Sequence, residues 1–177
     1  MEIVLVIMVV FSFVVVAWLG FAQSGDPPAP GRAAPEFRLP GAAGGEVSLA
    51  ALRGARALVA FHPQDETPEC LAVVERLNAL APEIESAGGR LVTVVVSGPE
   101  AAAAYAAAHG PALRVGCDAR GRTAKAYGSL VNLGFMKFAR KLVVLVDADG
   151  KVERTWRDTV GPQHVDEALK ALSGPPK

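Results

Sequence analysis

Apolar residues gather along the chain in runs whose lengths and spacings distinguish strands from helices. Three short continuous runs, 58–62, 91–96 and 142–146, have the length and composition of buried strands. After Cys70 the apolar residues recur every three or four positions as far as Ile84, which predicts a helix closed by the glycines at 88–89. A strand, a helix and a second strand in this order predict parallel pairing with a right-handed crossover.

The second half of the chain continues the alternation. An alanine-rich helix is expected over 99–109, a short strand over 113–115, a short helical segment over 123–127, and an antiparallel return strand over 152–156. Pro162 opens a final helix with apolar residues on one face. The chain is therefore expected to be an α/β protein with a central mixed β-sheet flanked by helices on both faces.

The N-terminal stretch from residue 3 to residue 22 is almost wholly apolar, and about 20 apolar residues in a helix can span a bilayer. It predicts a single hydrophobic helix that is either a transmembrane anchor, which would make the membrane a partner, or a signal peptide cleaved after Ala22 for export to the periplasm. The length of the run and the lack of basic residues before it favour the anchor. The expected organisation is a segment 1–22 of this kind, a flexible linker 23–33 and a folded domain 34–174.

Composition excludes several classes of function. The 18 basic and 18 acidic residues balance, and no basic excess or aromatic–basic interleaving suggests a nucleic-acid partner. Two cysteines are too few for a disulfide framework, and the three histidines are scattered without metal-ligand spacing. Neither a metal nor a cofactor is expected.

The candidate chemistry lies directly after the run 58–62. Pro63 ends the strand because it has no N–H for the ladder, and Thr67 followed by Pro68 reads as the N-cap and first position of a helix. Cys70 then falls in the first helical turn, where free N–H groups and the helix dipole favour a thiolate, the nucleophilic form of cysteine. The alternative is that Cys70 is a small buried apolar residue, as free cysteines commonly are.

The pattern Pro63-x-x-x-Thr67-x-x-Cys70 resembles the active-site signature of peroxiredoxins, the thiol-dependent peroxidases with a thioredoxin-like fold. The resemblance covers residues 30–173 and is greatest to the bacterioferritin-comigratory, or peroxiredoxin Q, branch. Its further pieces follow one another in the order of that branch: 34–37, 118–121, 124–128, 146–151 and 156–164.

The resemblance implies that Cys70 attacks hydrogen peroxide or an organic hydroperoxide and becomes a sulfenic acid, which an external thiol, thioredoxin-like or small, then reduces. It implies that Pro63 shields the cysteine and that the Thr67 hydroxyl binds thiolate and peroxide. The family's active-site arginine corresponds to Arg140, or to Lys141 in its place. His62 is an accessory candidate, since a one-cysteine branch of the family also has His-Pro here.

The chain departs from the branch at two other positions. The branch often carries a resolving cysteine five residues after the first one, where this chain has Glu75, so a one-cysteine enzyme is expected. Cys117 is a second candidate resolving residue, which would require the two Cα atoms to approach within about 7 Å. Glu69 replaces the usual glycine; it favours the helix start but opposes a thiolate.

Two other functions remain open from the sequence. One is an anchored thioredoxin-like thiol-disulfide oxidoreductase, although the chain has no Cys-x-x-Cys pair. The other is a peroxiredoxin-fold domain that has lost activity and serves as a binding module. Consumption of peroxide distinguishes the enzyme from the binding module.

Overall fold

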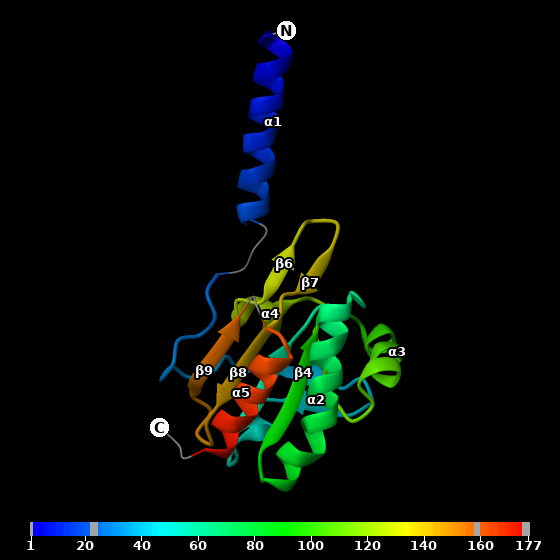
Figure 1. Cartoon of the computed structure of the whole chain (residues 1–177), viewed down its shortest axis with the longest axis vertical. Helices are drawn as coiled ribbons and strands as arrows, with labels where there is room; N and C mark the ends of the chain where they lie inside the picture. Colours follow the sequence, from blue (N-terminus) through cyan, green and yellow to red (C-terminus); the bar gives the residue numbers. More distant parts are fainter. Residues whose placement is uncertain (1, 22–24, 158–159, 175–177) are drawn as a thin grey trace.

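The computed structural model of the chain describes residues 2–21, 25–157 and 160–174, and its centre is a mixed β-sheet (Figure 1). In the described residues this sheet has five strands in the order β5-β4-β3-β8-β9. Their bounds are β3 Ala57–Phe61, β4 Arg90–Val95, β5 Val115–Cys117, β8 Leu142–Val146 and β9 Val152–Arg157.

The pairing directions agree with the prediction of a mixed sheet. Strand β3 is parallel to β4, and β4 is parallel to β5, whereas β8 runs antiparallel to both β3 and β9. Every residue of β3 and β8 is buried. Continuous apolar runs are the pattern expected of strands covered on both faces, and this explains why these two strands could be predicted from the sequence.

One face of the sheet is covered by two helices, α2 (Pro68–Ser86) and α5 (Pro162–Ser173), which lie side by side in Figure 1. Residues of both helices form one apolar cluster with β3 and β8, in which Leu77 packs with Leu58 and Leu145. Helix α3 (Pro99–His109) packs against the edge strand β5.

The opposite face carries a small hairpin instead of long helices. Its strands β1 (Arg38–Pro40) and β2 (Glu46–Ser48) are antiparallel, and a short turn of 3-10 helix, η1 (Ala50–Leu52), follows. Tyr127, which is fully buried beside the short helix α4 (Arg122–Ala126), fills the space beneath and donates a hydrogen bond of 2.9 Å to the carbonyl oxygen of Pro35.

The predicted elements are confirmed with two corrections. Strand β5 begins at Val115, not Leu113, because the N–H of Leu113 is used in a turn with the carbonyl oxygen of Gly110. A second hairpin, β6 (Leu130–Asn132) with β7 (Lys137–Ala139), was not predicted. Its strands have three residues each, too few to show an alternating pattern.

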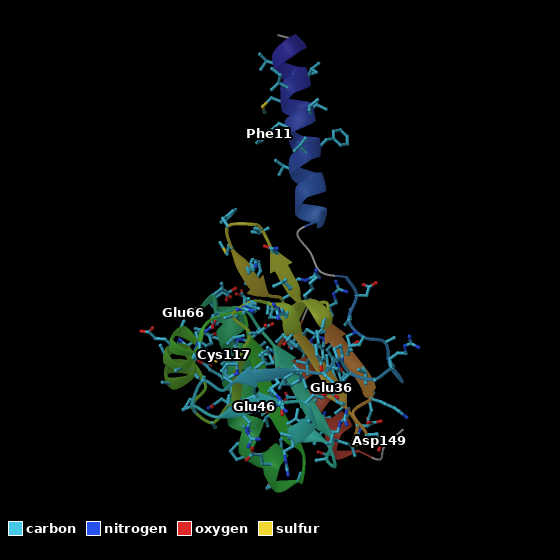
Figure 2. All side chains as sticks on the ribbon, turned by 180° about the vertical axis from the view of Figure 1, so that it is seen from behind. Phe11, Glu36, Glu46, Glu66, Cys117 and Asp149 are labelled. Atoms are coloured by element: carbon cyan, nitrogen blue, oxygen red, sulfur yellow. The ribbon has the colours of Figure 1, made fainter. Side chains whose placement is uncertain are left out.

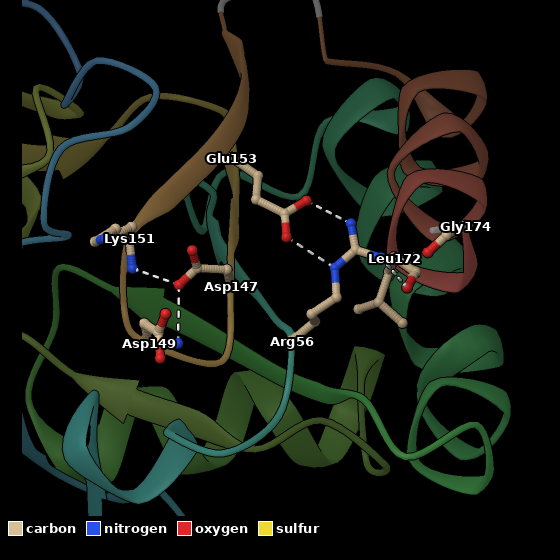
Figure 3. Close-up of polar contacts among 7 residues, drawn as sticks. All are labelled: Arg56, Asp147, Asp149, Lys151, Glu153, Leu172 and Gly174. Atoms are coloured by element: carbon tan, nitrogen blue, oxygen red, sulfur yellow. Dashed lines mark hydrogen bonds and ion pairs between the residues drawn. The ribbon is translucent and has the colours of Figure 1, made fainter. Parts of the chain in front are cut away.

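Arg56, directly before strand β3, connects this strand to β9 and to the end of α5 (Figure 3). Its guanidinium forms two parallel hydrogen bonds with the Glu153 carboxylate on β9, and the Nε–Oε1 distance is 2.9 Å. Its Nη1 donates to the carbonyl oxygens of Leu172 and Gly174 at the end of α5, over 2.8 and 2.6 Å. One side chain thus satisfies two helix-terminal carbonyls that would otherwise have no intrahelical partner.

The N-terminal segment forms helix α1 (Glu2–Phe21), and its described apolar side chains, among them Phe11, point outward (Figure 2). Crossing a bilayer takes about 20 consecutive apolar residues in one helix. Within the residues that the structure describes, none of the helices combines the length and apolar character that this requires. The predicted membrane anchor over residues 3–22 is therefore wrong. The alternative cleavage site, Ala22, lies outside the described residues.

Candidate active site

Cys70 lies in the first turn of helix α2, which follows strand β3 and the loop 62–67. Thr67 is the N-cap with extended backbone (φ −68°, ψ 148°), and its hydroxyl oxygen accepts a hydrogen bond of 3.4 Å from the Cys70 N–H. Pro68 occupies the first helical position, as predicted. The Cys70 side chain is buried, with 3% of the residue exposed.

Asp65 is a member of this site that the sequence interpretation overlooked. Its Oδ1 accepts one hydrogen bond from the Thr67 hydroxyl (3.0 Å) and another from the Thr67 N–H (3.2 Å). The negative charge of this carboxylate also raises the pKa of the Cys70 thiol. The signal in the sequence was a carboxylate two residues before an N-cap threonine, a spacing typical of a side chain that bonds the backbone two residues on.

The loop that carries Asp65 turns at Glu66, whose φ of 51° lies in the left-handed region. In the described chain it is the one residue other than glycine with such a φ. The Glu66 carboxylate lies 3.6 Å from His109 Nε2 at the end of α3. A strained backbone of this kind persists where its surroundings hold it, and such positions cluster at functional sites.

The environment of Cys70 favours the thiol. Burial is the largest influence and raises the pKa of the Cys70 thiol; Thr67 lowers it by hydrogen bonding, Asp65 raises it, and the positive charge of Lys141 lowers it. The net direction is upward. The pKa of Asp65 is lowered, because hydrogen bonds from Cys70 and Thr67, with the charge of Lys141, outweigh the effect of its desolvation.

The two candidate cations differ in what they contact. The Arg140 guanidinium donates to the carbonyl oxygen of Gly128 over 3.4 Å. The backbone N–H of Arg140 donates to the carbonyl oxygen of Ser129 over 2.7 Å. Lys141, one residue before β8, is the cation whose charge acts on both Asp65 and Cys70.

His62 is buried, with 2% of the residue exposed, at the end of β3. Desolvation lowers its pKa, and hydrogen bonding to the Pro63 carbonyl oxygen (Nδ1–O distance 3.1 Å) opposes this. Its ring lies 5.8 Å from the Tyr105 ring, centroid to centroid. Tyr105, which lies midway along the alanine-rich helix α3, was not singled out from the sequence. Burial and the charges of Cys70 and Asp65 raise the pKa of Tyr105 to about 12.

Cys117 occupies a different environment at the end of β5. It packs with Val95, Ala102 and Val115 in a small apolar cluster between the sheet edge and α3 (Figure 2). Burial raises the pKa of its thiol, and both cysteines are free. The structure therefore holds a second buried thiol without a disulfide to Cys70.

A pocket of about 350 Å³ opens beside the loop 62–67. Two walls of different character enclose it. The loop contributes His62, Pro63, Gln64 and Asp65, whereas the other wall is largely apolar and comes from Val96 and the second hairpin: Met136, Lys137, Phe138 and Ala139. The hairpin that was not predicted thus completes the pocket.

Comparison with known proteins agrees with this geometry. The profile of the AhpC/TSA family matches residues 30–155. The chain is 28% identical to the peroxiredoxin Bcp of Escherichia coli K12 over 146 residues, covering 80% of this chain and 94% of that protein. It is 30% identical to a putative peroxiredoxin of Mycobacterium tuberculosis over 151 residues, covering 81% and 94% respectively.

The fold agrees as well. The crystal structure of peroxidoxin BcpB from Mycobacterium tuberculosis superposes with a TM-score of 0.70 at 23% identity, over 85% of this chain and 96% of that one. The predicted thioredoxin-like fold with a mixed central sheet is thereby confirmed, with an N-terminal helix added. The resemblance seen in the sequence is confirmed too: the chain belongs to the AhpC/TSA family and is a peroxiredoxin, a thiol-dependent peroxidase.

Proposed function

We propose that this peroxidase works with one cysteine, Cys70, and returns to its reduced state through an external thiol. The observation that supports this most directly is the place of Cys70 in the first turn of α2, where Thr67 caps its N–H and the charge of Lys141 lowers the pKa of its thiol against the effect of burial. Cys117 lies in a separate apolar cluster and Glu75 offers no thiol, so we assign no resolving residue within the chain.

In the proposed reaction the Cys70 thiolate attacks the terminal oxygen of the hydroperoxide. The S–O bond forms as the O–O bond breaks, and the leaving alkoxide or hydroxide takes a proton. Thr67 and the free N–H groups of the first α2 turn stabilise the negative charge that moves across the oxygens, and Lys141 supplies a cation. Two external thiols then reduce the sulfenic acid to the thiol, with release of one disulfide and one water.

The remaining candidates take supporting roles in this proposal. Pro63 stands between the end of β3 and the pocket and would limit the access of water to the sulfur. His62, buried and with a lowered pKa, would act as a neutral imidazole beside the pocket. The apolar wall of the pocket, built on the second hairpin, suits the carbon chain of an organic hydroperoxide. The catalytic domain in this proposal is 34–174.

The test is peroxide consumption by the full chain with dithiothreitol as reductant, for wild type, Cys70→Ser and Cys117→Ser. We expect hydrogen peroxide and an organic hydroperoxide to be turned over by wild type and Cys117→Ser, and Cys70→Ser to be inactive. Wild type that consumes peroxide no faster than Cys70→Ser would instead identify a peroxiredoxin-fold binding module. Loss of turnover in Cys117→Ser would assign that thiol a part in the cycle.

A further inference from the structure

The hydroxyl group of Thr67 has a single proton and two neighbours that compete for it. In this structure the hydroxyl donates to Asp65 Oδ1 over 3.0 Å. The proposed reaction requires that same proton at the Cys70 sulfur or at the peroxide oxygen. Because a hydroxyl can donate only one hydrogen bond, the proton cannot serve Asp65 and the sulfur at the same time.

The negative charge of Asp65 also acts on the thiol of Cys70, whose pKa it raises. Loss of the thiol proton places a negative sulfur near a negative carboxylate, and like charges at close range disfavour ionisation. The hydrogen bond from Thr67 and the charge of Asp65 therefore act in the same direction, against the reactive form of Cys70.

The position of Asp65 is held from both sides. The Thr67 N–H donates to Oδ1 over 3.2 Å, which fixes the carboxylate over the helix start. On the other side, Glu66 turns the backbone through the left-handed region and lies 3.6 Å from His109 Nε2. The loop thus presents the Asp65 side chain, and not that of Glu66, to the sulfur.

We propose that Asp65 restrains the active site: its carboxylate holds the Thr67 hydroxyl directed away from the sulfur and sets a negative charge against the thiolate, and the enzyme reacts when the hydroxyl turns from Asp65 to Cys70. The inference rests on the proposed function, since it takes Cys70 as the nucleophile. The other charged or titratable groups near this pair are His62, Glu66, Tyr105 and Lys141, and Lys141 is the cation that opposes the restraint.

The test variant is Asp65→Asn in the full chain, made on a Cys117→Ser background so that one thiol is followed. Asparagine keeps the shape and the acceptor for Thr67 N–H but removes the charge. Two quantities are measured: the pH profile of Cys70 alkylation by iodoacetamide, and the rate of hydrogen peroxide consumption at neutral pH. We expect the alkylation profile to move about one pH unit lower, and peroxide consumption to rise by about threefold to tenfold.

The control is Glu83→Gln, which removes one exposed negative charge from the far end of α2. We expect its alkylation profile to stay within about 0.2 pH units of wild type, since exposed charges at a distance are largely screened.

A second variant, Thr67→Val added to Asp65→Asn, removes the hydroxyl that the Asp65 change releases. The gain in peroxide consumption is then expected to disappear, which a purely structural role of Asp65 would not predict.

An unchanged profile, a shift to higher pH, or slower peroxide consumption in Asp65→Asn would overturn the inference; the last result would instead make Asp65 a general base. Should Asp65→Asn fail to fold, Asp65→Ser removes the charge with a smaller side chain and tests the same shift. The failure of the proposed function looks different: the alkylation profile would still move, but neither wild type nor variant would consume peroxide.

Discussion

The positive charge of Lys141 acts on the thiol of Cys70, against the burial that raises the pKa of this thiol. The lysine precedes strand β8 and lines a second pocket, of about 450 Å³, with Pro68 and Glu69 at the start of α2. The side chain of its neighbour Arg140 turns to the carbonyl oxygen of Gly128. In the proposed reaction Lys141 is therefore the cation that assists Cys70.

Replacing Lys141 by methionine is expected to slow peroxide reduction at neutral pH by about tenfold and to move Cys70 alkylation to higher pH, because an opposite charge near a thiol favours its ionised form. Alkylation rates measured across the pH range, together with peroxide turnover, check this. Lys125→Met, which removes an exposed lysine from α4, is the control and should behave as wild type. Equal rates in the two variants would exclude Lys141 from the site.

The buried ion pair of Arg56 with Glu153 is expected to be strongly coupled. Only 16% and 12% of the two side chains are exposed, and removing one partner of such a pair costs about 3–5 kcal/mol, since the other charge is left buried without compensation. Urea unfolding of Arg56→Met, Glu153→Leu and the double variant tests this as a double-mutant cycle. We expect the double variant to be more stable than the sum of the single changes implies; strict additivity would mean that the two charges act independently.

Asp118 is expected to be the residue that stabilises the start of α4. Its buried carboxylate accepts hydrogen bonds from Arg122 N–H (2.9 Å) and Ala124 N–H (2.8 Å). Asp118→Ala leaves both N–H groups without this acceptor and should lower the free energy of unfolding by about 2–3 kcal/mol. Asp118→Asn keeps one side-chain acceptor oxygen and should lose less. Chemical denaturation of both variants measures these losses of stability. Below its unfolding transition the alanine variant should still consume peroxide, whereas loss of turnover there would indicate a role of Asp118 in the reaction.

The stability of the chain in mild acid is expected to depend on Glu167. Hydrogen bonding from Trp156 Nε1 (3.0 Å) is the largest influence that lowers its pKa, and Arg154 adds to it. A carboxyl whose pKa is depressed by folding binds fewer protons in the folded state than in the unfolded state. Its contribution to stability is therefore complete above the ordinary glutamate pKa and is lost as the pH falls through the lowered value.

Thermal unfolding at about pH 6 and about pH 3, compared between wild type and Glu167→Gln, measures that contribution. The variant should show a smaller drop in midpoint between the two pH values, because glutamine cannot titrate. A drop as large as that of wild type would assign the acid sensitivity to other carboxyl groups. Asp166→Asn, on the same helix and paired with Arg76, is the matched control.

Local patterns in the sequence determined most of the fold. The run 58–62 forms most of the buried strand β3, 57–61, and the run 142–146 forms β8. Thr67 followed by Pro68 begins α2. Burial of continuous apolar runs and capping of a helix depend on residues a few positions apart, which is why these elements could be predicted. The spacing from Pro63 to Cys70 was sufficient to identify the peroxiredoxin family. The same apolar pattern, applied to residues 3–22, led to a membrane anchor that the structure contradicts.

Tertiary structure decided which distant groups meet at the site. One wall of the pocket beside the loop 62–67 comes from a hairpin whose strands are too short to show a period. Tyr105 contacts His62 from a helix more than 40 residues later, and Arg56 contacts Glu153 across a separation of 97 residues. Partners so far apart leave no local pattern in the sequence, so these contacts arise only when the sheet brings distant side chains together.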